Sequence, residues 1–248
     1  MTIHNNSVLP SDELVVRRIV RAIQKAIEED VPEFCRENHM ETMNSIRYVR
    51  GDKINDNLRS LVVSDDMMLI SFKRHSWDGR ILVDNKNYVT YSITTQQNLS
   101  AIPKKNRRCP HFLHSILAVE NGDLKGQYVQ ESLFPMDQFG DDVLEDDYTK
   151  IVSGVLAPDS GYRHYIVAYE YARSELCDVK LMLLDKSFST VRELSLNDFI
   201  KPDFAQLTAK QSGSAEHTTI SANTAKELVT IKSGIRPELI EFDDEKQA

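Results

Sequence analysis

The sequence predicts an α+β fold in which antiparallel β-meanders are flanked by helices. Residues 67–95 show the apolar and polar alternation of strands broken by turn sequences, and residues 162–194 repeat that pattern. Stretches with apolar residues at helical spacing precede and separate the two runs. This order of helices and strands is also compatible with two similar subdomains, each centred on one meander.

The first 60 residues predict helices. From Ser11 to Glu29, apolar residues form one stripe opposite basic residues, and Ser11 is placed to cap the helix. We interpret this stripe as packing onto the protein's own core. Pro32 interrupts the helical pattern. Further helices are expected over residues 33–44 and 52–60, and a short strand over residues 61–64.

Residues 67–95 predict three strands joined by tight turns, and they contain Trp77, the single tryptophan of the chain. Residues 84–87 have turn chemistry, because Asp and Asn bond their own backbone and tolerate left-handed angles. His75, Trp77 and Arg80 gather at the edge of this meander. An aromatic ring and a guanidinium suit a base or a phosphate, so we expect a partner to bind there.

The second half predicts helices at 96–102, 110–119 and 141–155, then strands at 162–173, 178–184 and 190–194. Residues 121–147 are irregular and acidic, which favours a boundary between two halves. We therefore expect an N-terminal part over residues 1–125, a second part over 140–240 and an acidic tail over 241–248.

The composition limits the partners. A net charge of −8 disfavours general attraction to nucleic acid, and the densest basic stretch, Lys104–Arg108, is interpreted as a solvated loop. The three cysteines are far apart, which fits a reducing cytoplasm, and no secretory signal opens the chain. No apolar run approaches the roughly 20 residues of a membrane span. A cytoplasmic protein that binds another protein, with no membrane association, is expected, and its oligomeric state is left open.

One pattern resembles the metal-dependent nuclease core of the restriction-endonuclease-like fold. Pro158-Asp159 is followed, after a predicted strand, by Asp178-Val179-Lys180. In that chemistry two carboxylates, here Asp159 and Asp178, hold Mg²⁺ while a lysine, here Lys180, positions a water. Glu170 would be a third ligand. Acidic residues are abundant in this chain, so two unrelated turn residues are the simpler explanation of the pattern.

A second candidate metal site combines Cys109, His111 and His114. No fourth ligand lies nearby in the sequence, and the start of a helix at Pro110 accounts for these residues. The common motifs for phosphate loops, dinucleotides, zinc proteases and serine hydrolases are absent from the sequence. No cofactor is therefore expected outside the nuclease alternative, and whether the chain is an enzyme stays open.

Several short motifs in the first half resemble a bacterial family described only as a domain of unknown function. They are the basic-His75-Ser76-Trp77 sequence with Gly79, the Ile81–Asp84 and Tyr88–Ile93 strands, Pro110–Leu113, Asn121, the 11–29 helix and Asp56–Leu58. The resemblance implies a bacterial, cytoplasmic protein and provides no catalytic residue.

Two classes of function follow from the sequence. The acidic charge and the absence of a catalytic motif favour an interaction protein, for instance an immunity or antitoxin-like or phage-defence component that holds another protein. The loop from Tyr128 to Phe139, which carries aromatic residues, would contribute to that contact. The alternative is the metal-dependent nuclease.

Overall fold

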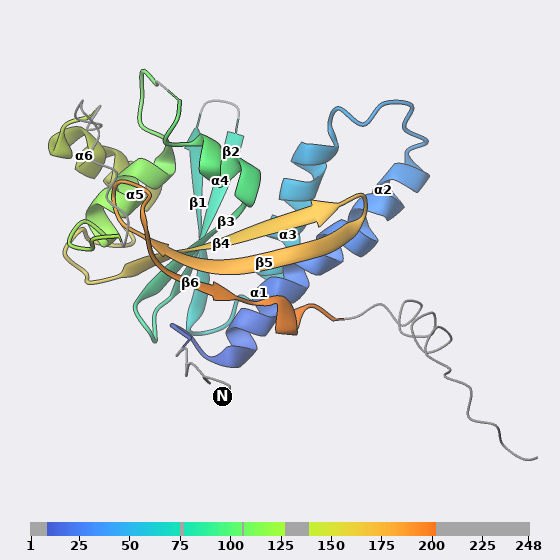
Figure 1. Cartoon of the computed structure of the whole chain (residues 1–248), viewed down its shortest axis with the longest axis horizontal. Helices are drawn as coiled ribbons and strands as arrows, with labels where there is room; N and C mark the ends of the chain where they lie inside the picture. Colours follow the sequence, from blue (N-terminus) through green and yellow to red (C-terminus); the bar gives the residue numbers. More distant parts are fainter. Residues whose placement is uncertain (1–8, 75–76, 106, 127–138, 202–248) are drawn as a thin grey trace, which may run out of the picture. The chain divides into compact units, whose positions relative to one another are not determined.

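The computed structural model describes residues 9–74, 77–105, 107–126 and 139–201, and its centre is a six-stranded sheet with the strands in sequence order (Figure 1). Strands β1 (Met67–Arg74), β2 (Trp77–Asp84) and β3 (Val89–Thr95) form the first meander. Strands β4 (Arg163–Ala172), β5 (Glu175–Leu184) and β6 (Thr190–Ser195) form the second. The predicted α+β class with antiparallel meanders is confirmed.

The two meanders join in one continuous sheet. β3 and β4 pair in parallel from Val89–Arg163 to Thr95–Tyr169, and all other neighbouring strands are antiparallel. The predicted boundary region falls in the connection between these two strands, and the described residues, from 9 to 201, belong to one compact unit. Residues 202–240 of the predicted second part and the predicted tail, 241–248, lie outside the described residues.

Helices cover both faces of the sheet. On one face lie α1 (Glu13–Lys25), the π-helical turn η1 (Ala26–Asp30), α2 (Val31–Glu37) and α3 (Ile46–Leu61). The other carries α4 (Gln96–Ala101), α5 (Phe112–Glu120) and α6 (Asp141–Ile151). A short 3₁₀ turn, η2 (Asn197–Phe199), follows β6.

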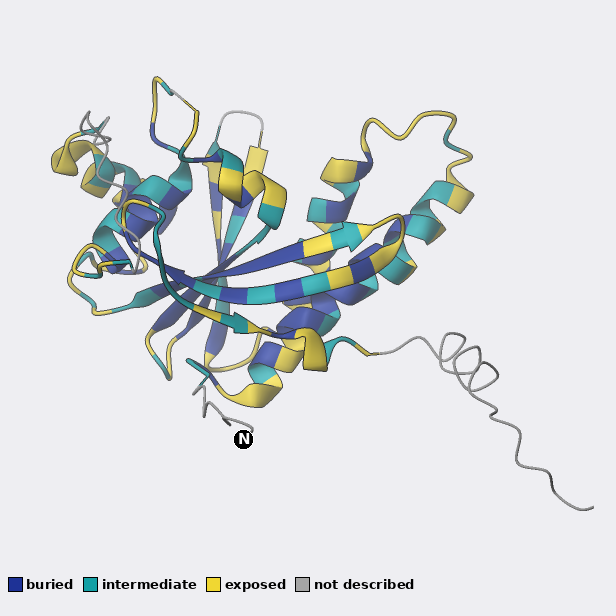
Figure 2. Ribbon diagram, in the orientation of Figure 1, coloured by how far each residue is buried: buried dark blue, intermediate teal, exposed yellow. Residues whose placement is uncertain are grey.

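The strands have two apolar faces because both are covered. In β4, Val167 and Tyr169 pack in the cluster beneath α1 and α3, whereas Ile166 and Ala168 pack beneath α4 and α5. Figure 2 shows the resulting buried centre of the sheet and the exposed outer helix surfaces. The stripe of α1 packs on the protein's own core, as the sequence predicts, with Ile19 and Ile23 almost fully buried.

Several local details differ from the sequence predictions; for instance, the helix predicted over residues 33–44 ends at Glu37. Ser11 does not cap α1, whose N-cap is Asp12; the Ser11 hydroxyl is buried and hydrogen-bonds Asp84 Oδ2 and Tyr91 Oη, each at 2.5 Å. The third helix runs from Ile46 to Leu61, so residues 61–64 add no strand. Gly51 lies inside this helix.

Candidate ligand-binding site

The sheet opens between β2 and β3 at one end. β1 and β2 pair along their whole length, from Met67–Asp84 to Arg74–Trp77. Pairing between β2 and β3 is limited to three residue pairs and stops at Leu82–Tyr91. Beyond that point a cleft of about 370 Å³ separates Trp77, Asp78 and Arg80 of β2 from residues 92–94 of β3. The interrupted pairing therefore creates the cleft.

An aromatic cluster holds the β1–β2 hairpin away from β3. The Phe72 ring lies over Gly79, its partner across the strands, where an added Cβ would be 2.2 Å from Phe72 Cζ. Phe72 also contacts Trp77 and Phe112, with ring centroids 5.6 and 5.2 Å apart. Because Phe112 belongs to α5, these contacts anchor the end of the hairpin to a helix instead of to β3.

The cleft lies at the carboxyl ends of the parallel strands. Thr94 of β3 and Tyr169 of β4 both line it, and both are among the last paired residues of their strands. Residues of α3 and α4 form its other walls, including Arg47 and Asn98. Ligands of sheets with parallel strands characteristically bind outside the carboxyl ends of those strands, so the position is typical of a binding site.

Basic side chains dominate the cleft although the whole chain is acidic. Arg47, Arg80, Lys105 and Arg107 line it, and the acidic side chains that line it are Asp52 and Asp78. These four basic and two acidic groups leave a local excess of two positive charges. Within the described part of the chain, none of the four basic groups forms an ion pair with a carboxylate. The cleft therefore has a positive local charge, which is complementary to an anion.

Two further features mark the Arg107 side of the cleft. The Nε atom of Arg107 is buried and has no hydrogen-bond partner, which is unusual for a buried donor. Burial, together with the positive charges of Arg107 and neighbouring groups, lowers the pKa of His111 to about 3. His111 is therefore a neutral ring near neutral pH, and its Nδ1 accepts a hydrogen bond from the Leu113 N–H.

Exposed aromatic rings complete the walls. Trp77 is 44% exposed and Tyr48 is 56% exposed, although both are large apolar groups. The guanidinium of Arg47 lies 4.8 Å from the centre of the Tyr48 ring. Both rings are available to stack on a planar ligand.

A buried polar network adjoins the cleft at Ser92, which lines it and is 1% exposed. Ser92 Oγ lies 2.9 Å from His164 Nε2, and His164 Nδ1 lies 2.7 Å from Thr90 Oγ1. The Thr90 hydroxyl donates to one carboxyl oxygen of Glu120, and the Tyr148 hydroxyl donates to the other at 3.0 Å. A chain of hydrogen bonds thus joins the cleft to a buried carboxyl.

Burial shifts the Glu120 carboxyl and the His164 imidazole of this network toward neutrality. It raises the pKa of Glu120 to about 7, although the hydrogen bonds from Thr90 and Tyr148 oppose that rise. It lowers the pKa of His164 to about 3. Near neutral pH the imidazole is therefore uncharged, while the carboxyl is partly ionised.

The residues expected from the sequence to bind a partner fall partly in this cleft. Trp77 and Arg80 lie on its β2 wall. His75 lies outside the described residues, as does the predicted partner loop from Tyr128 except for its last residue, Phe139. Lys105 and Arg107 of the basic stretch interpreted as a solvated loop also reach the cleft.

The residues of the nuclease alternative are divided between two places. Glu170 and Asp178 are register partners on β4 and β5, where Asp178 accepts hydrogen bonds from Gln96 and Asn197. Asp159 is exposed and precedes the opposite end of β4. Glu170 lies seven positions after Arg163, which is about 23 Å of strand, whereas ligands of one Mg²⁺ lie about 2 Å from it.

Lys180 is engaged elsewhere. Its Nζ pairs with Glu193 Oε1 at 2.8 Å across β5 and β6. Among the described residues no three His, Cys, Asp or Glu side chains converge to hold a metal ion, and this includes Cys109, His111 and His114. The structure therefore does not bring Asp159 and Asp178 together beside Lys180.

Sequence reasoning missed the buried network, although the sequence carries a signal for it. Glu120 is the one charged residue of the apolar helix 112–120, and His164 stands in an apolar strand. Thr90 and Ser92 alternate on one strand. Charged residues are rarely buried without a polar partner, so such positions in apolar elements indicate a shared network.

Comparison with known proteins gives the chain a family but no function. Within the described residues, no helix has the length and apolar character needed to cross a membrane. No curated protein and no solved structure matches the chain. A family model described as a family of unknown function (DUF5986) matches residues 9–246, so the resemblance extends well beyond the first half. The chain belongs to this family, DUF5986.

Proposed function

We propose that this protein binds a nucleotide in the cleft between β2 and β3. The observation that carries the proposal is the convergence of four basic side chains without ion-pair partners and two exposed aromatic rings at the carboxyl ends of parallel strands. A nucleotide has the complementary chemistry, because it joins an anionic phosphate to a planar base.

The parts of the ligand have separate places in this arrangement. A guanidinium binds phosphate oxygens through paired N–H donors, and Arg107 offers a buried Nε without a partner. A base stacks on an exposed ring such as Trp77. The cleft volume, about 370 Å³, is within the range of small-molecule pockets, so it suits one nucleotide better than a macromolecular surface.

The proposal is compatible with the acidic composition. The overall charge of −8 opposes general attraction to nucleic acid, but the local excess of positive charge in the cleft acts on a ligand at close range. The interaction role of immunity, antitoxin-like or defence type and the metal-dependent nuclease stay predictions from the sequence. The separation of Asp159 from Asp178 gives the nuclease no support.

The single tryptophan makes a direct test possible. Titration with AMP should change Trp77 fluorescence, and calorimetry on the same protein gives the affinity independently. Arg107→Ala should weaken binding by about tenfold, because it removes a charge-assisted hydrogen bond. Arg18→Ala removes the same charge from an exposed position of α1 and should leave the affinity unchanged. Equal affinities in the two variants, or no binding of AMP, would contradict the proposal.

A further inference from the structure

The hydrogen bonds between the cleft and Glu120 can run in either of two directions. In one, each group donates to the next group toward Glu120; in the other, each donates to the next group toward the cleft. The four residues joined in this way are Ser92, His164, Thr90 and Glu120, and each is at most 5% exposed. Water therefore has little access to the intermediate groups, and each proton takes the position that its neighbours allow. We refer to these four residues as the relay.

One direction follows when Glu120 is ionised. A carboxylate accepts hydrogen bonds only, so the Thr90 hydroxyl donates to it. Thr90 Oγ1 then accepts from His164, which places the imidazole proton on Nδ1. The bare Nε2 accepts the hydroxyl proton of Ser92, so Ser92 presents acceptor lone pairs alone to the cleft.

The opposite direction follows when Glu120 is protonated. With the proton on Oε2 and Tyr148 still donating to Oε1, the carboxyl O–H donates to Thr90 Oγ1. The Thr90 hydroxyl then turns to donate to His164 Nδ1. The imidazole proton then lies on Nε2 and is donated to Ser92 Oγ. The Ser92 hydroxyl proton is thereby released to point to the cleft.

We propose that the relay is a polarity switch that converts Ser92 from a hydrogen-bond acceptor to a donor toward the base of a bound nucleotide when Glu120 gains a proton. The inference rests on the proposed function for its ligand. At high pH the site favours a base with an amino group at the Ser92 position, and at low pH it favours a carbonyl oxygen there. Ser92 is thus a specificity-determining residue whose preference depends on a group outside the cleft.

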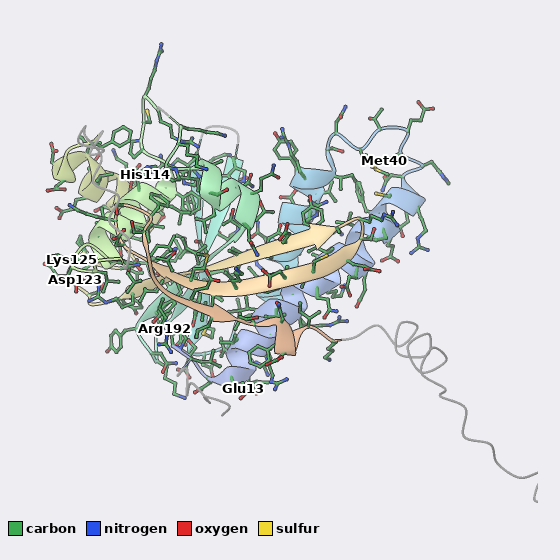
Figure 3. The ribbon with its side chains drawn as sticks, in the orientation of Figure 1. Glu13, Met40, His114, Asp123, Lys125 and Arg192 are labelled. Atoms are coloured by element: carbon green, nitrogen blue, oxygen red, sulfur yellow. The ribbon has the colours of Figure 1, made fainter. Side chains whose placement is uncertain are left out.

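The groups around Glu120 leave its proton free to control the relay. The titratable side chains that face it are Tyr148 from α6, Tyr162 ahead of β4, and His164 and Arg163 from β4. Tyr148 donates to the carboxyl oxygen that Thr90 does not use. Arg163 donates to the Glu120 main-chain oxygen, and its guanidinium is held by Asp123, one of the side chains labelled in Figure 3.

The ionisation behaviour is suited to such a switch. Burial places the pKa of Glu120 at about 7, so both directions occur near neutral pH. His164 stays neutral because burial lowers its pKa to about 3. A neutral imidazole has one proton and one lone pair, and moving that proton from Nδ1 to Nε2 reverses both of its hydrogen bonds.

The first experiment follows the His164 tautomer by nitrogen-15 NMR of the full chain between about pH 5.5 and about pH 8, where histidine tautomers are readily distinguished from the cation. Signals are assigned by their loss in His164→Gln. The Nδ1-protonated form should dominate at the upper limit and the Nε2-protonated form at the lower limit. Glu120→Gln should hold the Nε2-protonated form throughout, since its amide donates to Thr90. A tautomer that does not change in the unmodified protein would overturn the relay.

The second experiment compares AMP with IMP, which differ by an amino group against a carbonyl at the same ring position. Preference for AMP over IMP should fall by about fivefold on going from about pH 8 to about pH 5.5, as for one mismatched hydrogen bond. Phosphate ionisation affects both ligands equally and cancels in the ratio. Ser92→Ala and Glu120→Gln should each abolish the pH dependence.

The outcomes separate the two proposals. If neither nucleotide binds, the proposed function fails and the assignment of Ser92 as a specificity determinant fails with it, while the tautomer measurement still decides the relay. If both bind and the preference is independent of pH in the unmodified protein, nucleotide binding stands and the switch is overturned. A ratio that changes equally in Ser92→Ala would also overturn it.

Discussion

Replacing Glu120 with Gln should change how the stability of this protein depends on pH. Burial raises the pKa of Glu120 from 4.5 to about 7. A raised pKa means that the folded state holds the proton more tightly than the unfolded state does. The contribution to stability is therefore complete below pH 4.5 and is lost as the pH rises through 7.

The size of the loss follows from the shift. At 1.36 kcal/mol for each pKa unit, the change from 4.5 to about 7 amounts to about 3 kcal/mol. Glutamine keeps the shape and hydrogen bonding of the neutral carboxyl and does not ionise. The free energy of unfolding of Glu120→Gln, minus that of the unmodified protein, should therefore rise by 2 to 3 kcal/mol, as an order of magnitude, between about pH 5 and about pH 8.

Urea unfolding followed by circular dichroism at a series of pH values measures this difference. Contributions from other groups, including the opposite one from His164, are present in both proteins and cancel. Glu145→Gln makes the same chemical change at an exposed position of α6 and is the control. A difference between Glu120→Gln and the unmodified protein that is flat with pH would show that Glu120 is not held in its neutral form by burial.

Two other predictions concern the packing of the β1–β2 hairpin and the turn between β2 and β3. Gly79→Ala would place a Cβ 2.2 Å from Phe72 Cζ. We expect it to lower the free energy of unfolding, measured with urea, by about 1–3 kcal/mol and to alter Trp77 fluorescence, because Trp77 packs on Phe72. Unchanged values of both would contradict the described packing. Asp84→Ala removes the acceptor for Ser11 and for the main-chain N–H groups of Lys86 and Asn87, so it should lower the free energy of unfolding by about 3 kcal/mol. The control Asp159→Ala, at an exposed position, should lower it by less than about 0.5 kcal/mol. Equal losses in the two Asp variants would refute the burial argument.

The elements of the fold could be predicted because their signals are local. Alternation and turn residues locate the strands from β1 to β6 within a few residues, and the Asp84 turn has the expected chemistry, with its side chain accepting main-chain N–H groups. The same chemistry recurs at Asp185, which accepts from Ser187 and Ser189. Such patterns need no information from distant parts of the chain.

The cleft could not be predicted in the same way, because contacts between distant residues create it. Alternation identifies β2 as a strand, but the end of its pairing with β3 depends on Phe112, far along the chain, packing on Phe72 and Trp77. Net charge likewise averages over the molecule and conceals a local excess of basic groups. Trp77 and Arg80 were identified because their own chemistry suits a ligand, whereas Arg47 and Lys105 required the fold.

The cost of Glu120 is itself an argument that its role is more than structural. At neutral pH a buried carboxyl that has no ion pair with Lys or Arg destabilises the fold, and no such pair to Glu120 exists within the described residues; the guanidinium of Arg163, which donates to the Glu120 main-chain oxygen, is held by Asp123. An apolar side chain or a glutamine would satisfy the same space at lower cost. A group that destabilises the protein, titrates near pH 7 and connects through hydrogen bonds to a cleft has the properties expected of a functional residue, as the relay requires. If Glu120→Gln raises the free energy of unfolding and also removes the pH dependence of ligand preference, the carboxyl group is needed for the ligand preference and not for the stability of the fold.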